Sequence, residues 1–183
     1  LKSDWTVWTW GLGQYGQLGN GISIAPVTEP QQVSGISDII AVAAGSYHTV
    51  ALKRGGTVWT WGSNNAGQLG LGNTTAQSTP QQVPGLDNVS RIAACGDTTV
   101  VLKKDGTVWA WGSNAAGQLG IDAAYSSEPV QIQGFADIDE IAVGNNFILA
   151  CKKDKTVWGI GANNVGQLGI GNYVNQSAPV QIP

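Results

Sequence analysis

The stretch Val58-Trp59-Thr60-Trp61-Gly62, followed shortly by Gly67-Gln68-Leu69-Gly70, decides the fold because both of its motifs recur along the chain. Copies of the tryptophan motif begin at positions 7, 58, 108 and 157, so successive copies are 51, 50 and 49 residues apart. Each copy is followed at the same distance by a Gly-Gln-Leu-Gly motif, which begins at positions 16, 67, 117 and 166. Self-similarity at a fixed period is typical of repeat architectures, so we expect one structural unit per ~50 residues.

The unit has the composition of a β-structure. Its apolar segments are short, rich in Val, Ile, Thr and Trp, and bounded by Gly, Pro or Asn, which is typical of strands. Between two such segments, Lys103-Lys104-Asp105-Gly106 predicts a tight hairpin turn. Four strands per unit, repeated at constant spacing without a helical period, predict a β-propeller built from four-stranded blades.

The units are not all complete. The third and fourth strands of the unit occur four times, whereas the first and second occur three times. We therefore expect three full blades preceded by half a blade, in one partial propeller that covers residues 1–183. Its parts are a half unit at 1–35 and full units at 36–85, 86–134 and 135–183.

The repeated tryptophans are expected to form the core between blades. Trp59 and Trp61 are two residues apart, so they point to the same face of their strand. Each broad face of a propeller blade is covered by the next blade, and one buried aromatic side chain removes roughly 150–250 Å² from water. Trp5 occupies a turn position instead, and we expect it to be exposed.

The unit that contains Leu52, Gly56-Thr57, Trp61-Gly62, Asn64 and Gly67-Gln68-Leu69-Gly70 resembles the regulator of chromosome condensation repeat family. The resemblance covers essentially the whole chain. It implies a seven-bladed ring, of which this chain would supply about half, and a fold without chemistry of its own. The tryptophan-rich, charge-poor version seen here is similar to bacterial members, which favours a secreted or cell-surface location in a bacterium.

Composition excludes several classes of protein. Charged residues make up only 11% of the chain and the formal net charge is −3, so nothing basic is concentrated enough to neutralise nucleic-acid phosphates. No apolar run approaches the ~18 residues of a membrane-spanning helix, so no membrane insertion is expected. The chain contains no Met, so we expect Leu1 to belong to a processed form or to a piece of a longer protein.

The sequence offers little for catalysis. The single histidine, His48, has Thr98 and Phe147 as its counterparts in the other units, so we interpret it as structural. The fourfold Gly-Gln-Leu-Gly motif is interpreted as a structural turn, because no helix follows it to form a phosphate-binding loop. Asp137, Asp139 and Glu140 are best explained as a solvated turn. We therefore expect no enzyme activity.

The two cysteines lack the spacing of a metal site or a disulfide framework. Cys95 is aligned with Ala44 and Val143, and Cys151 with Leu52 and Leu102, so both are expected to fill apolar positions. Neither a metal ion nor a cofactor is expected.

The hypothesis that remains is an interaction module that binds a protein partner through loops on one ring face, because variable loops on a constant scaffold usually carry specificity. The candidate binding residues are Ile22, Ile24, Thr75, Gln77, Tyr125, Ser126, Tyr173 and Asn175. A carbohydrate-binding propeller, with Tyr125 and Tyr173 stacking on a sugar, is the alternative. Guanine nucleotide exchange is a second alternative, implied by the resemblance. A second chain or the remainder of a longer parent is expected to complete the ring.

Overall fold

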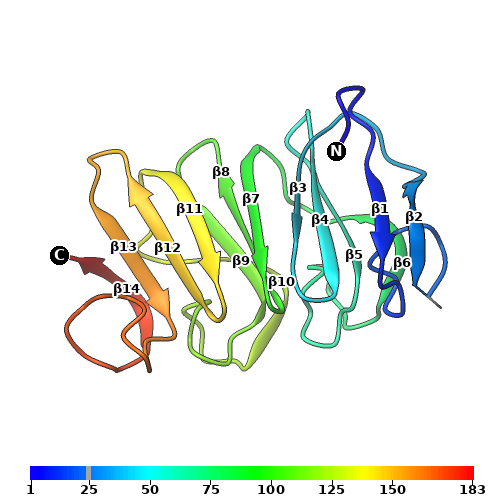
Figure 1. Ribbon diagram of the computed structural model, residues 1–183. Coiled ribbons are helices and arrows are strands. Elements are labelled where there is room, and N and C mark those ends of the chain that lie inside the picture. The colour runs from blue at the N-terminus through cyan, green and yellow to red at the C-terminus, as the bar shows by residue number, and fades with distance from the viewer. Residues whose placement is uncertain (24–25) are drawn as a thin grey trace.

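The computed structural model describes residues 1–23 and 26–183, and all regular secondary structure in these residues is β-strand (Figure 1). A two-stranded sheet comprises β1 (Trp8–Gly11) and β2 (Val27–Gln32). The second sheet comprises β3 (Ile39–Ala44), β4 (His48–Lys53), β5 (Val58–Gly62) and β6 (Gln77–Gln82). The third comprises β7 (Val89–Cys95), β8 (Thr98–Lys103), β9 (Val108–Ser113) and β10 (Tyr125–Gln131). The fourth comprises β11 (Ile138–Gly144), β12 (Phe147–Lys152), β13 (Val157–Gly161) and β14 (Gln176–Ile182).

The sheets stand in a row in chain order, as blades of a propeller do (Figure 1). Within each four-stranded sheet, consecutive strands pair antiparallel, so every sheet is a meander. Neighbouring sheets approach each other along their first strands, β3, β7 and β11. The prediction of an all-β chain with three full blades and a leading half blade is therefore confirmed.

The core lies between the blades. Val50 and Leu52 of one sheet pack with Val101 and Trp111 of the next. Trp61 and Trp111 are fully buried, which confirms that these two tryptophans form the interblade core. Trp5 is 42% exposed in its turn, as expected.

The Gly-Gln-Leu-Gly turns connect neighbouring blades through one backbone carbonyl. The carbonyl of Gln17 accepts hydrogen bonds from Trp61 Nε1 at 2.9 Å and from Thr49 Oγ1 at 3.0 Å, both in the next sheet. The Gln68 carbonyl accepts the matching pair from Trp111 and Thr99. Ring carbons and Nε1 of Trp61 would lie about 2.6–3.0 Å from a Cβ at Gly19, so this turn requires a glycine at its end.

Strand register corrects the predicted position of Cys95. Cys95 pairs with Thr98 as Gly144 pairs with Phe147, so it occupies the position of Gly45 and Gly144 and not that of Ala44 and Val143. A Cβ at Gly144 would collide with the Phe147 ring, whereas Thr98 is small enough to leave room for a cysteine. Cys151 lies opposite Val157 as Leu52 lies opposite Val58, so its predicted alignment is correct. Both thiols are free and partly exposed.

Candidate functional site

The two ends of the blades differ in chemistry. At the lower end in Figure 1 lie the connections from the third to the fourth strand of each sheet and the turns from the first to the second strand. We call this end the loop face; its described residues are 12–23, 45–47, 63–76, 96–97, 114–124, 145–146 and 162–175, together with the first residues of the strands that follow. The opposite end carries the turns between second and third strands and the connections between sheets, and we call it the turn face.

All the candidate binding residues that the structure describes lie at or next to the loop face. Ile22, Tyr125 and Tyr173 project into solvent, and Tyr173 is 74% exposed. Ile24 lies outside the described residues.

Others among them hold their loops in shape. The Thr75 carbonyl accepts a hydrogen bond from Asn64 Nδ2 at 3.0 Å, and Asn175 Oδ1 accepts one from the Asn163 amide at 2.8 Å. Ser126 Oγ donates to the Glu128 carbonyl at 2.7 Å, and Gln77, the first residue of β6, pairs with Gly62 of β5. These contacts give the four residues structural roles in addition to any role in binding.

An aromatic pair on the loop face was missed by the sequence interpretation. The rings of Tyr15 and Tyr47 lie 4.8 Å apart between their centroids, and both side chains are exposed. At the next interface, Asp97 stands at the position of Tyr47 and its Oδ1 accepts a hydrogen bond from Gln68 Nε2 at 2.8 Å. Gln118 similarly reaches Asn146. The sequence does carry a signal for this pair. The next unit has Asp97 at the position of Tyr47, and the next two units have alanine, at 66 and 116, at the position of Tyr15.

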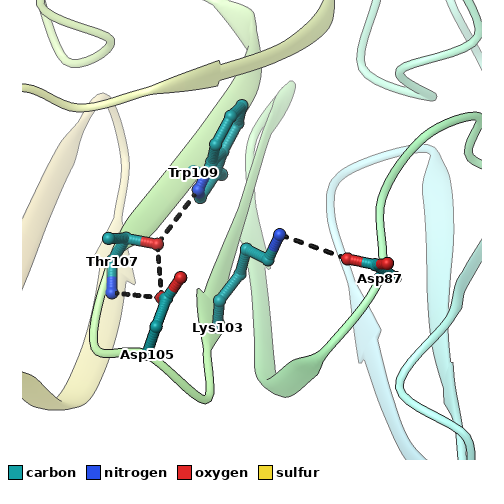
Figure 2. Close-up of polar contacts among 5 residues, drawn as sticks. All are labelled: Asp87, Lys103, Asp105, Thr107 and Trp109. Carbon is teal, nitrogen blue, oxygen red and sulfur yellow. Dashed lines mark hydrogen bonds and ion pairs between the residues drawn. The ribbon is translucent and has the colours of Figure 1, made fainter.

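The turn face is built from charged hairpins with a recurring hydrogen-bond relay (Figure 2). Asp105 Oδ1 accepts from the Thr107 hydroxyl at 2.6 Å and from its amide at 3.0 Å, and Trp109 Nε1 donates to the Thr107 hydroxyl at 3.1 Å. The Thr107 hydroxyl and amide hold the pKa of Asp105 below its usual value. The same relay occurs at Asp4-Thr6-Trp8 and Asp154-Thr156-Trp158.

His48 is buried between two blades. The Thr99 hydroxyl donates to the Gln68 carbonyl, so it accepts from His48 Nε2 at 2.8 Å. His48 Nδ1 has no hydrogen-bond partner, and burial lowers the pKa of the imidazole to about 4. The ring is therefore neutral near pH 7 and packs against Gly45.

Within residues 1–23 and 26–183, no group of three or more His, Cys, Asp or Glu side chains is placed to hold a metal ion. No helix in that part of the chain is long and apolar enough to cross a membrane.

Comparison with known proteins agrees with this architecture. The family model described as "RCC1-like domain" matches residues 1–183. Two human proteins match over part of the chain: "E3 ubiquitin-protein ligase HERC2" is 46% identical over 78 residues, and "Protein RCC2" is 40% identical over 77 residues. These alignments cover 42% and 41% of the chain but only 2% and 15% of those proteins.

Two solved structures match nearly the whole chain. Human WBSCR16 superposes with a TM-score of 0.88 and 23% identity, over 99% of this chain and 48% of that one. Yeast RCC1 (Prp20) bound to Kap60 superposes with a TM-score of 0.86 and 22% identity, over 97% of this chain and 44% of that one. The chain thus spans about half of these propellers, so its ring is incomplete alone. The sequence relatives come from human, mouse and zebrafish, which corrects the expectation of a bacterial-type member.

Proposed function

The chain belongs to the RCC1-like domain family, and from that premise we propose that it is a non-catalytic propeller module that binds a protein partner through its loop face. The remaining blades come from a second chain or from the remainder of a longer parent. The partner is a protein, and neither nucleic acid nor a membrane takes part.

The observation that carries the proposal is the distribution of exposed apolar side chains. Most large hydrophobic residues that are exposed lie on the loop face: Leu12, Tyr15, Ile22, Tyr47, Tyr125, Val165, Tyr173 and Val174. Exposed apolar side chains that gather on one face mark interaction surfaces, and tyrosine is enriched among residues that dominate binding energy. The turn face instead presents charged hairpin residues such as Lys104 and Asp105, which are exposed to solvent.

The matched structures support protein binding as the activity. One is a complex of yeast RCC1 with Kap60, and another is a structure of Prp20p from Saccharomyces cerevisiae, which is described together with its binding to Gsp1p and histones. Those partners are properties of the yeast protein. They make a protein the first class of ligand to test here.

Two other functions rank lower. Guanine nucleotide exchange is implied by the resemblance to the regulator of chromosome condensation family. The uniform spacing of the repeats leaves no inserted segment in a blade that could act on a GTPase. A carbohydrate site is favoured by the exposed rings of Tyr125 and Tyr173, but the loop at 63–76 carries no aromatic residue, so such a site is not repeated in every blade.

Site-specific photocrosslinking tests the proposal. A benzophenone side chain is introduced at Tyr173 or Tyr125 on the loop face, and at Lys104 on the turn face as the matched control, in the full-length protein in its native cells. We expect discrete protein adducts from the loop-face positions and none from Lys104. Adducts formed only from Lys104 would overturn the assignment of the face. Loss of the loop-face adducts after glycosidase treatment would favour the carbohydrate alternative. Faster release of labelled GDP from a GTPase when this protein is added would favour exchange.

A further inference from the structure

A cavity of about 350 Å³ lies between the second and third sheets, on their flank. Its walls come from the backbone of Gly70–Gly72, from Leu71, Pro84 and Leu86, and from Trp109 and Pro129 of the following blade. Glu128 and Lys103 supply its charged groups. This volume is at the lower end of the range for ligand pockets, which are mostly apolar with few polar groups.

The repeats show why the cavity is open at this interface. Leu86 occupies the position that the larger Phe135 fills, fully buried, in the next unit. A Cβ at Gly134 would meet the Pro179 ring at 3.4 Å, whereas nothing lies within 4 Å of the corresponding position at Gly85. The interface between the third and fourth sheets is therefore filled at the place where the interface between the second and third sheets has a cavity.

One wall of the cavity is rigid. The Trp109 indole is held by the Thr107 hydroxyl, which is held in turn by Asp105 (Figure 2). Lys103 lies 5.5 Å from the centre of the same indole, and its ammonium pairs with Asp87 at 3.3 Å. The charge of Lys103 is thus balanced within its own blade by Asp87.

Glu128 has no such partner. Its Oε1 lies 3.3 Å from the position of a Cβ on Gly72, at the wall of the cavity. Among the described residues, its carboxylate forms no ion pair. Lys103, Asp87 and Glu128 together give the cavity one uncompensated negative charge.

From these groups we propose that the cavity binds the side chain of an arginine presented by a partner protein. The guanidinium is planar, stacks on aromatic rings and bonds carboxylates in a bidentate fashion. Its alkyl stem packs against Leu71, Leu86 and Pro84, its plane lies on Trp109, and its charge is met by Glu128. The site lies between the two blades and includes only Gly70–Gly72 of the loop face, and it does not rest on the loop-face function proposed above.

Titration of the full-length protein with N-acetylarginine methylamide tests this site, with the Trp109 indole N–H as the NMR reporter. We expect a saturable shift of that signal. Glu128→Thr, which introduces the residue found at Thr79, should weaken binding about tenfold or more, the equivalent of one charge-assisted hydrogen bond. Leu86→Phe, which introduces the residue found at Phe135, should abolish the shift by filling the cavity.

The controls separate binding from folding and from charge alone. Ala178→Glu places a carboxylate at the equivalent position of the packed interface, and it should create no second site. All variants should keep the melting temperature of the parent chain within a few degrees. A shift that survives Leu86→Phe would overturn the site, and an equal shift with N-acetylleucine methylamide would overturn its cationic specificity.

Discussion

At the residue scale, the Asp-Thr-Trp relay is complete in three hairpins and broken in one. Gly55 stands in the second hairpin where the others have Asp4, Asp105 and Asp154. Without the carboxylate, the Thr57 hydroxyl makes no bond to the indole, and the buried Trp59 Nε1 has no hydrogen-bond partner. A buried donor that lacks a partner costs roughly 1–3 kcal/mol.

We predict that Gly55→Asp raises the free energy of unfolding by about 1 kcal/mol, because it orients Thr57 toward the indole. The backbone permits the change: the φ of Gly55 is not in the left-handed region, and nothing lies within 4 Å of an added Cβ. Chemical denaturation measures the gain. Gly55→Ala is the control for lost flexibility of the unfolded chain, and a gain from alanine equal to that from aspartate would show that the relay contributes nothing.

His48 makes stability depend on pH. Its pKa is about 4 in the folded chain and 6.5 when unperturbed, so the unfolded chain binds more protons between these values. Stability therefore falls as pH is lowered from about 6.5 to 4, by an amount on the order of 3 kcal/mol when complete. The pKa values of the relay aspartates are lowered from 3.8, so their titration lies below this window.

The variant His48→Phe should remove the pH dependence between about 6.5 and 4. The chain already accommodates phenylalanine at this position, since Phe147 packs over Gly144 as His48 packs over Gly45. Denaturation curves at several pH values compare the two proteins. An unchanged slope in the variant would assign the effect to other groups.

At the scale of the element, one backbone carbonyl, that of Gln17 or Gln68, ties a blade to the next through a Thr and a Trp at the first two interfaces. Trp61→Ala and Trp111→Ala should each lower the free energy of unfolding by roughly 3–5 kcal/mol, through loss of a buried indole and its hydrogen bond. Trp5→Ala should cost far less, about 0.5 kcal/mol. Trp5 lies exposed in a turn with its ring under Arg54. Similar losses for all three would contradict the assigned strand roles.

The interface between the third and fourth sheets has apolar residues at the same positions. Ile148 and Ile160 replace both the Thr and the Trp, and both are fully buried. The Gln118 carbonyl therefore receives neither of the two side-chain hydrogen bonds that Gln17 and Gln68 receive. The two replacements occur together, which indicates that Thr and Trp act as one unit at the other interfaces.

The elements could be predicted from the sequence because their signal is repeated. Four copies at constant spacing reveal the strands, the turns and the buried Trp61 and Trp111. Register within one unit could not be predicted as well, since Cys95 aligns by sequence with Ala44 and Val143 although it occupies the position of Gly45 and Gly144. The structure shows that Cys95 fits at this position because the small Thr98 lies opposite it on the neighbouring strand. A relation between two paired residues cannot be recognised from either residue alone.

The candidate site was predicted less well than the fold. The sequence indicates which loops vary, and the exposed Tyr125 and Tyr173 lie in them. It does not show that Asn175 and Thr75 bond within their own loops, or that Tyr15 and Tyr47 meet across 32 positions of the chain. The flank cavity depends on the difference in size between Leu86 and Phe135, which becomes a cavity only once the neighbouring blade is in place.

At the scale of the whole molecule, the row of blades leaves two broad faces without a neighbouring blade among the described residues. Trp10 occupies the same position in its strand as Trp61 and Trp111, yet it is 59% exposed whereas they are fully buried. Val42 of β3 is also exposed. At the other end, a Cβ at Gly169 would meet only Ile182 within 4 Å, whereas those at Gly19 and Gly70 would meet a tryptophan ring.

We therefore predict that the isolated 183-residue polypeptide self-associates at micromolar concentration, because unpaired strand edges and large apolar faces favour association. Sedimentation velocity should show a mass above 19.0 kDa that rises with concentration. Trp10→Gln should weaken the association, because it removes the largest exposed ring from one face, whereas Trp5→Gln should not, because Trp5 lies in a turn at the edge. Supplying the remaining blades in one polypeptide should bury Trp10, which iodide quenching of its fluorescence would detect. A stable 19.0 kDa monomer with a single cooperative transition would show instead that half a ring is sufficient, and that the exposed tryptophan is tolerated in water.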